Sequence, residues 1–136
     1  MLLYAATQTL GRENALGVSV RGDIFPSHEA AMADAIARAH GLNLEIIQLS
    51  PMGLESFRAN PPDRCYHCKT FLFSLLKDHA RSHGVAHVVE GSNVDDLGDH
   101  RPGRRALAEL SVLSPLLDAG LGKADIRALA RRWGLD

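Results

Sequence analysis

The sequence contains no long apolar run and carries almost no net charge. No stretch approaches the ~18 apolar residues that a membrane span needs. The opening residues, MLLYAA, lack the basic region and long apolar core of a secretory signal. The 15 basic and 16 acidic side chains give a formal net charge of -1, which excludes a general attraction to nucleic acid or to an anionic membrane. We therefore expect a cytoplasmic protein without nucleic-acid or membrane partners.

Cysteine is scarce as well, because the chain has only Cys65 and Cys68. Their Cys-x-x-Cys spacing in a reducing compartment suggests metal or redox chemistry before a structural disulfide. At the first turn of a helix, beside Arg64 and Lys69, the thiols are expected to have a lowered pKa. Zinc bound with the intervening His67 is a poor alternative, since that side chain points away from a shared metal. A half-buried pair of free thiols is the other alternative.

The hydrophobic pattern predicts alternating helices and strands, without repeats or low-complexity segments. Strand-like runs lie at residues 15–20, 44–49 and 85–90. Helical patterns lie at residues 2–10, from residue 27 to Gly41, from Asp63 to Gly84, and over Ile126, Leu129, Ala130 and Trp133. Such alternation in 136 residues predicts one α/β domain with a mostly parallel sheet.

The helix expected to end at Gly41 carries an apolar stripe. Its members recur at helical spacing and are Met32, Ala35, Ile36 and Ala39. This i, i+3, i+4, i+7 spacing predicts a helix, which Gly41 ends.

A polar segment follows the predicted strand over residues 85–90. It reads EGSNVDDLGDHRPG from Glu90 to Gly103 and combines small, acidic and basic residues with a Pro-Gly turn. In a parallel sheet, such a loop lies at the carboxyl ends of the strands, where ligands bind. The alternative is a solvated surface turn, because Asp, Asn and Gly favour turns for purely local reasons.

Several motifs follow one another in a single register over nearly the whole chain. They are NPPDRCYHCK at 60–69, EGSNVDD at 90–96, RPG at 101–103 with Ala106, SPL at 114–116 and KADIR at 123–127. Together they resemble the LarE family, the ATP-dependent sacrificial sulfur transferases of the PP-loop, or adenine nucleotide alpha-hydrolase-like, superfamily. The resemblance implies a three-layer, mostly parallel sheet of Rossmann-like type that lacks its first strand. Residues 1–136 would then form a single partial PP-loop nucleotide-binding domain.

The resemblance also implies an activity for the complete enzyme. The enzyme would activate a substrate carboxylate with ATP and replace an oxygen by sulfur. Its substrate would be pyridinium-3,5-biscarboxylic acid mononucleotide, a nucleotide-like carboxylate on the route to the nickel pincer cofactor of lactate racemase. The full-length enzyme is expected to be a homo-oligomer.

The chain departs from the family pattern in two ways. It has no Ser-Gly-Gly-x-Asp-Ser loop to hold the ATP pyrophosphate, and it does not contain the family's sulfur-donating cysteine segment. We therefore expect a chain that is truncated at both ends and inactive by itself. The absent first strand would lie between the strands predicted at 15–20 and 85–90.

Under the same resemblance, the polar segment would hold ATP and Mg²⁺. Asp95 and Asp96 are expected to be catalytic residues that hold Mg²⁺ or orient phosphate-bound water, because a hard cation prefers oxygen ligands. Gly91, Ser92 and Asn93 would contact the nucleotide.

The third expected catalytic residue is Arg101, which would pair with a phosphate or carboxylate in a bidentate fork. The alternative pairs Arg101 with Asp99 and leaves the following Pro-Gly to turn the chain. Cys65 and Cys68 would be metal ligands, supplying two of the three cysteines of an iron–sulfur cluster in the full-length enzyme. A cluster normally takes three or four protein thiolates.

Two other functions remain open. One is a nucleotide-binding remnant or an assembly module without turnover. The other is a different PP-loop ATPase, such as a tRNA-thiolating enzyme or an NAD or GMP synthetase.

The histidines are scattered along the chain. His79, His83 and His87, for example, have no carboxylate or cysteine at a telling spacing. They are expected to be surface or half-buried groups.

Overall fold

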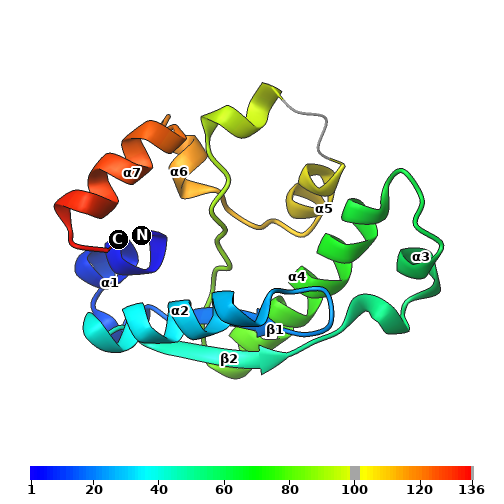
Figure 1. Ribbon diagram of the computed structural model, residues 1–136, viewed down its shortest axis with the longest axis horizontal. Helices are drawn as coiled ribbons and strands as arrows, with labels where there is room; N and C mark the ends of the chain where they lie inside the picture. Colours follow the sequence, from blue (N-terminus) through cyan, green and yellow to red (C-terminus); the bar gives the residue numbers. More distant parts are fainter. Residues whose placement is uncertain (99–101, 136) are drawn as a thin grey trace. The chain divides into compact units, whose positions relative to one another are not determined.

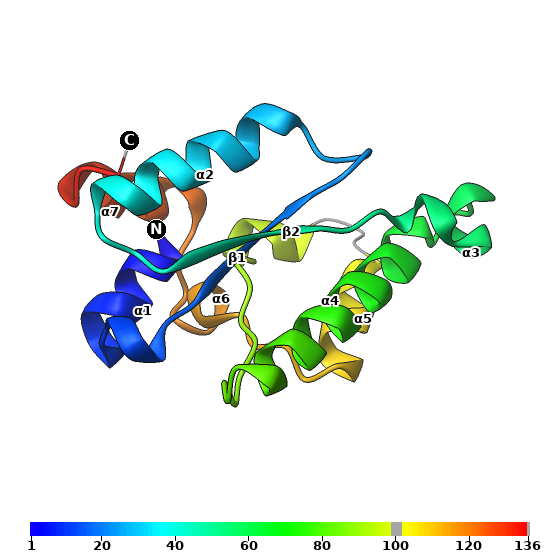
Figure 2. The same ribbon diagram turned by 90° about the horizontal axis from the view of Figure 1, so that it is seen from below.

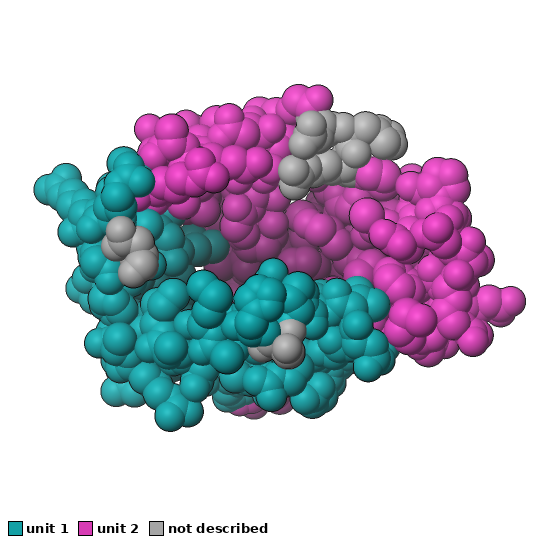
Figure 3. All heavy atoms as spheres, viewed as in Figure 1, with its two compact units in different colours: residues 1–50, 128–136 teal, residues 51–127 magenta. Residues whose placement is uncertain are grey.

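The computed structural model (Figure 1) describes residues 1–98 and 102–135. The chain divides into two compact units, coloured in Figure 3: Met1–Ser50 with Ala128–Asp136, and Pro51–Arg127. The described residues form a mixed α/β protein with seven α-helices and a two-stranded parallel sheet. In this part of the chain, no helix combines the length and the apolar character needed to cross a membrane.

The first unit is built on a strand–helix–strand motif. Strand β1 (Gly17–Arg21) leads through helix α2 (Ser27–Ala39) to strand β2 (Leu44–Gln48). The strands pair in parallel, with Gly17 opposite Leu44 and Arg21 opposite Gln48, an arrangement that requires a crossover between them. Figure 2 shows α2 alongside the two strands. The strands predicted at 15–20 and 44–49 are thereby confirmed.

Two glycines allow close packing around β1. Helix α1 (Leu2–Leu10) and the short 3-10 helix η1 (Arg12–Asn14) precede this strand. A Cβ at Gly17 would lie 2.5 Å from Cδ2 of Leu3, and a Cβ at Gly22 would lie 1.9 Å from the carbonyl oxygen of Leu49. The second distance is far below any real carbon–oxygen contact. The backbone after β2 can therefore approach the end of β1 only because residue 22 has no side chain.

The end of helix α7 (Lys123–Arg132) and the residues after it belong to the first unit from Ala128 onward. The Trp133 ring lies 5.3 Å from the ring of Tyr4, and the Tyr4 ring lies 5.6 Å from that of His40. His40 Nε2 also lies 3.0 Å from the carbonyl oxygen of Gly134. These contacts hold the C-terminal segment against α1 and the end of α2.

The helix predicted to end before Gly41 is confirmed, but its apolar stripe is not the face that it buries. All four of its members are exposed, with Met32 at 60% and Ile36 at 36%. The helix instead buries Ala30 and Ala37. Because alanine occurs on every side of this helix, the apolar periodicity fits more than one face, and the small side chains take the closely packed side.

The second unit is mainly helical. Helix α4 (Arg64–Ser82) packs against α5 (Gly103–Glu109), and both views show them side by side (Figures 1 and 2). The remaining segments are η2 (Pro51–Gly53), α3 (Glu55–Arg58), η3 (Val94–Gly98), α6 (Pro115–Asp118) and the start of α7. The buried apolar side chains of α5 and of the segment after it are Ala106, Leu107, Val112 and Leu116.

The strand predicted over residues 85–90 is reduced to one isolated bridge, so this prediction is wrong. Val89 pairs in parallel with Leu113. Glu90 N–H donates to Leu113 O at 2.9 Å, and Leu113 N–H donates to Val88 O at 3.0 Å. The pairing cannot extend because Pro115, two residues after Leu113, lacks an N–H and begins helix α6. The three-layer sheet of the PP-loop type therefore stays a prediction.

Candidate functional site

The bridge at Val89 leads into the acidic loop, which we define as residues 90–98. Its first carboxylate, Glu90, is half-buried and accepts two hydroxyl hydrogen bonds. Ser114 Oγ donates to Oε1 at 2.5 Å, and Ser92 Oγ donates to Oε2 at 2.8 Å. Two donors compensate this carboxylate for the water that it loses on burial. Glu90 therefore joins the start of the loop to the segment that precedes α6.

Asn93 and Asp96 form the buried centre of the loop, with exposures of 8% and 6%. The Asn93 backbone N–H and Nδ2 both donate to Asp96 Oδ2, at 3.0 and 3.1 Å. At its other end, Asn93 Oδ1 accepts the backbone N–H of Asp95 at 3.1 Å. A buried carboxylate paired in this way avoids the cost of an unsatisfied charge. The Asn93 and Asp96 side chains thus fix the backbone on which Asp95 stands.

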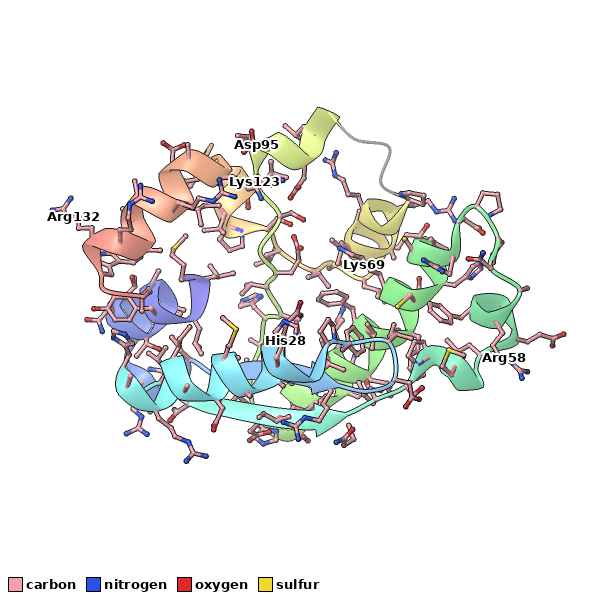
Figure 4. The ribbon with its side chains drawn as sticks, in the orientation of Figure 1. His28, Arg58, Lys69, Asp95, Lys123 and Arg132 are labelled. Atoms are coloured by element: carbon pink, nitrogen blue, oxygen red, sulfur yellow. The ribbon has the colours of Figure 1, made fainter. Side chains whose placement is uncertain are left out.

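Asp95 is exposed and binds the start of helix α7. Its Oδ2 accepts the backbone N–H of Lys123 at 2.6 Å, while Asp125 Oδ2 accepts that of Gly122 at 3.0 Å. Figure 4 shows Asp95 and Lys123 next to each other. The first N–H groups of a helix have no intrahelical acceptor, and carboxylates there also interact favourably with the helix dipole. Asp95 therefore acts as a cap supplied by a residue distant in sequence.

The other predicted site residues differ in their exposure and in their hydrogen-bond partners. Gly91 is exposed, and no atom lies within 4 Å of the place where a Cβ would stand. Ser92 is half-buried against Glu90. Arg101 and its alternative partner Asp99 lie outside the described residues. The structure thus joins Asn93, Asp95 and Asp96 by hydrogen bonds and holds Ser92 on Glu90. The catalytic and nucleotide-binding roles of these residues stay predictions.

The thiols lie on the first turns of α4, where Cys65 is exposed and Cys68 is half-buried. Burial raises the pKa of Cys68, the neighbouring Cys65 raises it further, and Arg64 and Lys69 only partly offset this. The expectation of a lowered pKa is therefore wrong for Cys68. The sequence shows nearby positive charges but not the desolvation that outweighs them.

A second contact set fastens this part of α4 to α5. Tyr66 OH donates to Glu109 Oε2 at 2.6 Å, and the Arg105 guanidinium lies 3.9 Å from the centre of the Tyr66 ring. Arg105 Nε also lies 3.4 Å from Glu109 Oε1. A Cβ at Gly103 would lie 3.3 Å from the carbonyl oxygen of Cys65. Among the described residues, no hydrogen bond or ion pair joins the two thiols to the acidic loop.

Asp95 and the two cysteines differ in the metal group that their ligand atoms could hold. Of the residues that the structure describes, none donates a hydrogen bond to the second oxygen of Asp95, Oδ1. One exposed carboxylate oxygen fits Mg²⁺, which usually takes one or two carboxylates together with water and phosphate oxygens. Cys65 and Cys68 are the only cysteines of this chain. They do not fit an iron–sulfur cluster by themselves, since a cluster takes three or four protein thiolates.

Sequence reasoning placed Glu90 and Ser114 in motifs but gave them no role. They stand 24 positions apart, and no periodicity connects them. The capping role of Asp95 toward Lys123 was missed for the same reason. The sequence indicated only that the segments of Glu90 and Asp95, of Ser114 and of Lys123 all belong to the motifs.

The chain is similar to curated proteins along its length. It is 33% identical over 135 residues to the pyridinium-3,5-bisthiocarboxylic acid mononucleotide synthase of Lactiplantibacillus plantarum, covering 99% of this chain and 49% of that protein. The same identity and length relate it to an uncharacterized protein of Synechocystis sp., covering 99% and 50%. It is 35% identical over 100 residues to an uncharacterized protein of Methanocaldococcus jannaschii, covering 74% and 38%. No protein-family model matches the chain.

The chain thus spans about half the length of the curated relatives it matches. Nearly every residue takes part in the alignment with the synthase. This chain therefore belongs to the LarE family.

Proposed function

We propose that this chain is the portion of an ATP-dependent sulfur transferase that carries the acidic loop and the thiol pair. The observation behind this proposal is the 33% identity over 99% of the chain to a protein named for making a pyridinium bisthiocarboxylic acid mononucleotide. A thiocarboxylate is a carboxylate in which sulfur has replaced an oxygen. The full enzyme would therefore act on a nucleotide-like carboxylate in cofactor biosynthesis.

The chemistry requires activation because a carboxylate is a poor electrophile. In the proposed reaction, a carboxylate oxygen attacks the α-phosphorus of ATP, which gives an acyl adenylate and releases pyrophosphate. A sulfur nucleophile then adds to the acyl carbon, and AMP leaves with the original carboxylate oxygen. The carbon–sulfur bond of the donor then breaks by elimination: the sulfur keeps the electron pair and stays on the acyl carbon, while the donor loses the adjacent proton and becomes an alkene. One oxygen is thereby replaced by sulfur, and the proposed donor lies outside the residues of this chain.

In this proposal, the acidic loop serves the first step. Asp95 would hold Mg²⁺ through Oδ1 while Oδ2 stays on the Lys123 N–H, and the ion would neutralise phosphate charge. Asn93 and Asp96 would act as positioning residues, because their hydrogen bonds fix the loop backbone. The open space at Gly91 would let the nucleotide reach the main chain.

The chain by itself is proposed to bind nucleotide without turning it over. Its sequence contains no Ser-Gly-Gly-x-Asp-Ser loop to hold the pyrophosphate. Loss of even one preorganised donor from such a site costs about 100-fold to 1000-fold in rate. A chain without any of these amides should show no measurable release of pyrophosphate.

A specific observation favours a second candidate, an assembly module without a nucleotide site. One oxygen of Asp95 and one of Asp96 already accept backbone or side-chain hydrogen bonds within the unit. The hydrogen bonds of the loop would then serve only to hold η3 against the start of α7.

The test is Mg²⁺-dependent binding of ATP to the 136-residue chain, measured by calorimetry with and without Mg²⁺. Asp95→Asn keeps an oxygen acceptor for the Lys123 N–H but removes the charge. The proposal expects Mg²⁺ to strengthen ATP binding to the natural chain. In Asp95→Asn, the Mg²⁺-dependent increase in ATP affinity should be smaller by about tenfold or more, which is the scale of single contributions around metal sites. Asp118→Asn, which changes an exposed carboxylate at the end of α6, is the matched control and should bind as the natural chain does.

Three other outcomes would contradict part of the proposal or favour the alternative. Equal Mg²⁺-dependent binding in Asp95→Asn and the natural chain would contradict the assignment of Asp95. No ATP binding by a folded chain would favour the assembly module. Release of pyrophosphate by the natural chain above the level of Asp95→Asn would contradict the absence of turnover.

A further inference from the structure

The last turn of α4 carries two histidines on one face. His79 and His83 are four positions apart, so their side chains project from the same side of the helix. Their ring centroids lie 4.4 Å apart with an interplanar angle of 42°. One ring nitrogen of His79 lies within 4.8 Å of one of His83. Two ring nitrogens at this separation are close enough to share one ion, which each imidazole nitrogen would bind at ~2.0–2.1 Å.

Hydrogen bonds define the tautomer of His83. Ser82 Oγ donates its single proton to the carbonyl oxygen of His79 at 2.7 Å. His83 Nδ1 lies 3.1 Å from that Ser82 oxygen and 3.0 Å from the His79 carbonyl oxygen. Since the hydroxyl proton is already used and a carbonyl can only accept, Nδ1 must carry the proton and donate. In the neutral ring, Nε2 then holds the lone pair that a metal needs.

This arrangement is the one that metal-binding histidines usually show. A ligating imidazole commonly donates its other N–H to a backbone carbonyl, which fixes the ring and raises its basicity. Here the His79 carbonyl oxygen accepts that bond within the same turn. The orientation of His83 is therefore set before any ion arrives.

The local charge also favours a cation. His83 occupies the C-cap of α4, and its N–H donates to the carbonyl oxygens of His79 and Ala80 at 3.3 and 3.1 Å. The carbonyl end of a helix carries partial negative charge. Arg81, on the same turn, pairs with Asp78 at 2.7 Å, so its positive charge is balanced locally.

We propose that His79 and His83 form a bidentate site for a divalent transition-metal ion such as Zn²⁺, with water completing the coordination. Imidazole suits Zn²⁺, Cu²⁺ and Ni²⁺, whereas Mg²⁺ prefers oxygen ligands. The site is thus distinct in chemistry from the one proposed at Asp95. With two protein ligands, it holds its ion exchangeably and not as a structural zinc would be held.

The experiment titrates Zn²⁺ against a chromophoric chelator in a chain with Cys65→Ser and Cys68→Ser, which removes the thiols as competing ligands. Groups that only hydrogen-bond to a metal ligand commonly contribute about tenfold to hundredfold in metal affinity. Replacing a ligand, as in His79→Gln or His83→Gln, is therefore expected to weaken Zn²⁺ binding by at least about tenfold. His87→Gln is the matched control, an exposed histidine of the same unit, and should leave the affinity unchanged. Excess Mg²⁺ should not displace the ion.

A second measurement does not depend on whether the variants fold. In the same thiol-free chain, nitrogen NMR should show Zn²⁺ shifting the Nε2 resonance of His83 while Nδ1 keeps its proton. Unchanged affinity in His79→Gln and His83→Gln, an equal loss in His87→Gln, coordination through Nδ1 of His83, or no Zn²⁺ binding would each overturn the site.

Discussion

The cap that Asp95 provides to α7 can be tested by separating its hydrogen bond from its charge. Asp95 Oδ2 accepts the Lys123 N–H at 2.6 Å. Asp95→Ala removes both the acceptor and the charge, and loss of a helix cap costs about 0.5–2 kcal/mol. Asp95→Asn keeps an oxygen acceptor and loses only the interaction of the charge with the helix dipole, which is about 0.3–1 kcal/mol. We expect Asp95→Ala to lose more stability than Asp95→Asn.

Hydrogen exchange of the Lys123 amide is the most direct assay. A loss of about 1–2 kcal/mol in Asp95→Ala corresponds to a protection about 5–30-fold lower, and urea denaturation should show the same order among the variants. Asp118→Ala serves as the control for removing an exposed carboxylate from a neighbouring helix. Unchanged Lys123 protection in Asp95→Ala would refute the cap. Equal losses in Asp95→Ala and Asp95→Asn would show that charge alone stabilises the start of α7.

Two further predictions concern the first strand and the thiols. Gly22→Ala should lower the free energy of unfolding by about 1–3 kcal/mol or prevent folding, because its Cβ would lie 1.9 Å from Leu49 O. Urea denaturation measures this, with Gly53→Ala as the control because nothing lies within 4 Å of a Cβ there. An equal loss of unfolding free energy in the two variants would contradict the prediction. Because burial raises the pKa of Cys68 above the ordinary 9.0, its neutral thiol stabilises the fold at lower pH, and this contribution is lost as the pH rises through the raised folded value. Alkylation of Cys68, followed by mass spectrometry across pH, should have its midpoint above 9.0, and a midpoint below that value would contradict the assignment.

The sequence predicted the elements that local periodicity defines. The helices at residues 2–10, 27–39 and 64–82 lie where the apolar spacing and the terminal glycines indicated, and the chain turns at Gly41 and Gly84 with φ of +63° and +68°. Such signals lie within a few residues of each other, so they can be read along the chain. The face that a helix buries depends on its neighbours, and in α2 the regularly spaced apolar residues are exposed while Ala30 and Ala37 are buried.

Tertiary surroundings account for the incorrect expectations. Val85 to Glu90 has the composition of a strand, yet a strand exists only where a partner continues the ladder, and here Leu113 supplies one bridge before Pro115 starts a helix. Cys68 has two positive neighbours in sequence, yet the three-dimensional burial of its thiol outweighs them. Both outcomes depend on segments that the local pattern cannot identify.

The acidic loop shows why a motif can indicate a site without assigning its atoms. The run from Glu90 to Asp96 contains three carboxylates that look equivalent in sequence. In the structure, Glu90 is held by two serine hydroxyls, Asp96 is buried under Asn93, and Asp95 is exposed at the start of α7. A cation that binds Glu90 would compete with a hydroxyl donor at either oxygen, and one that binds Asp96 would have to reach a buried carboxylate. Of these three carboxylates, Asp95 combines exposure with an oxygen to which no described residue donates, and this is why we propose it as the Mg²⁺ ligand.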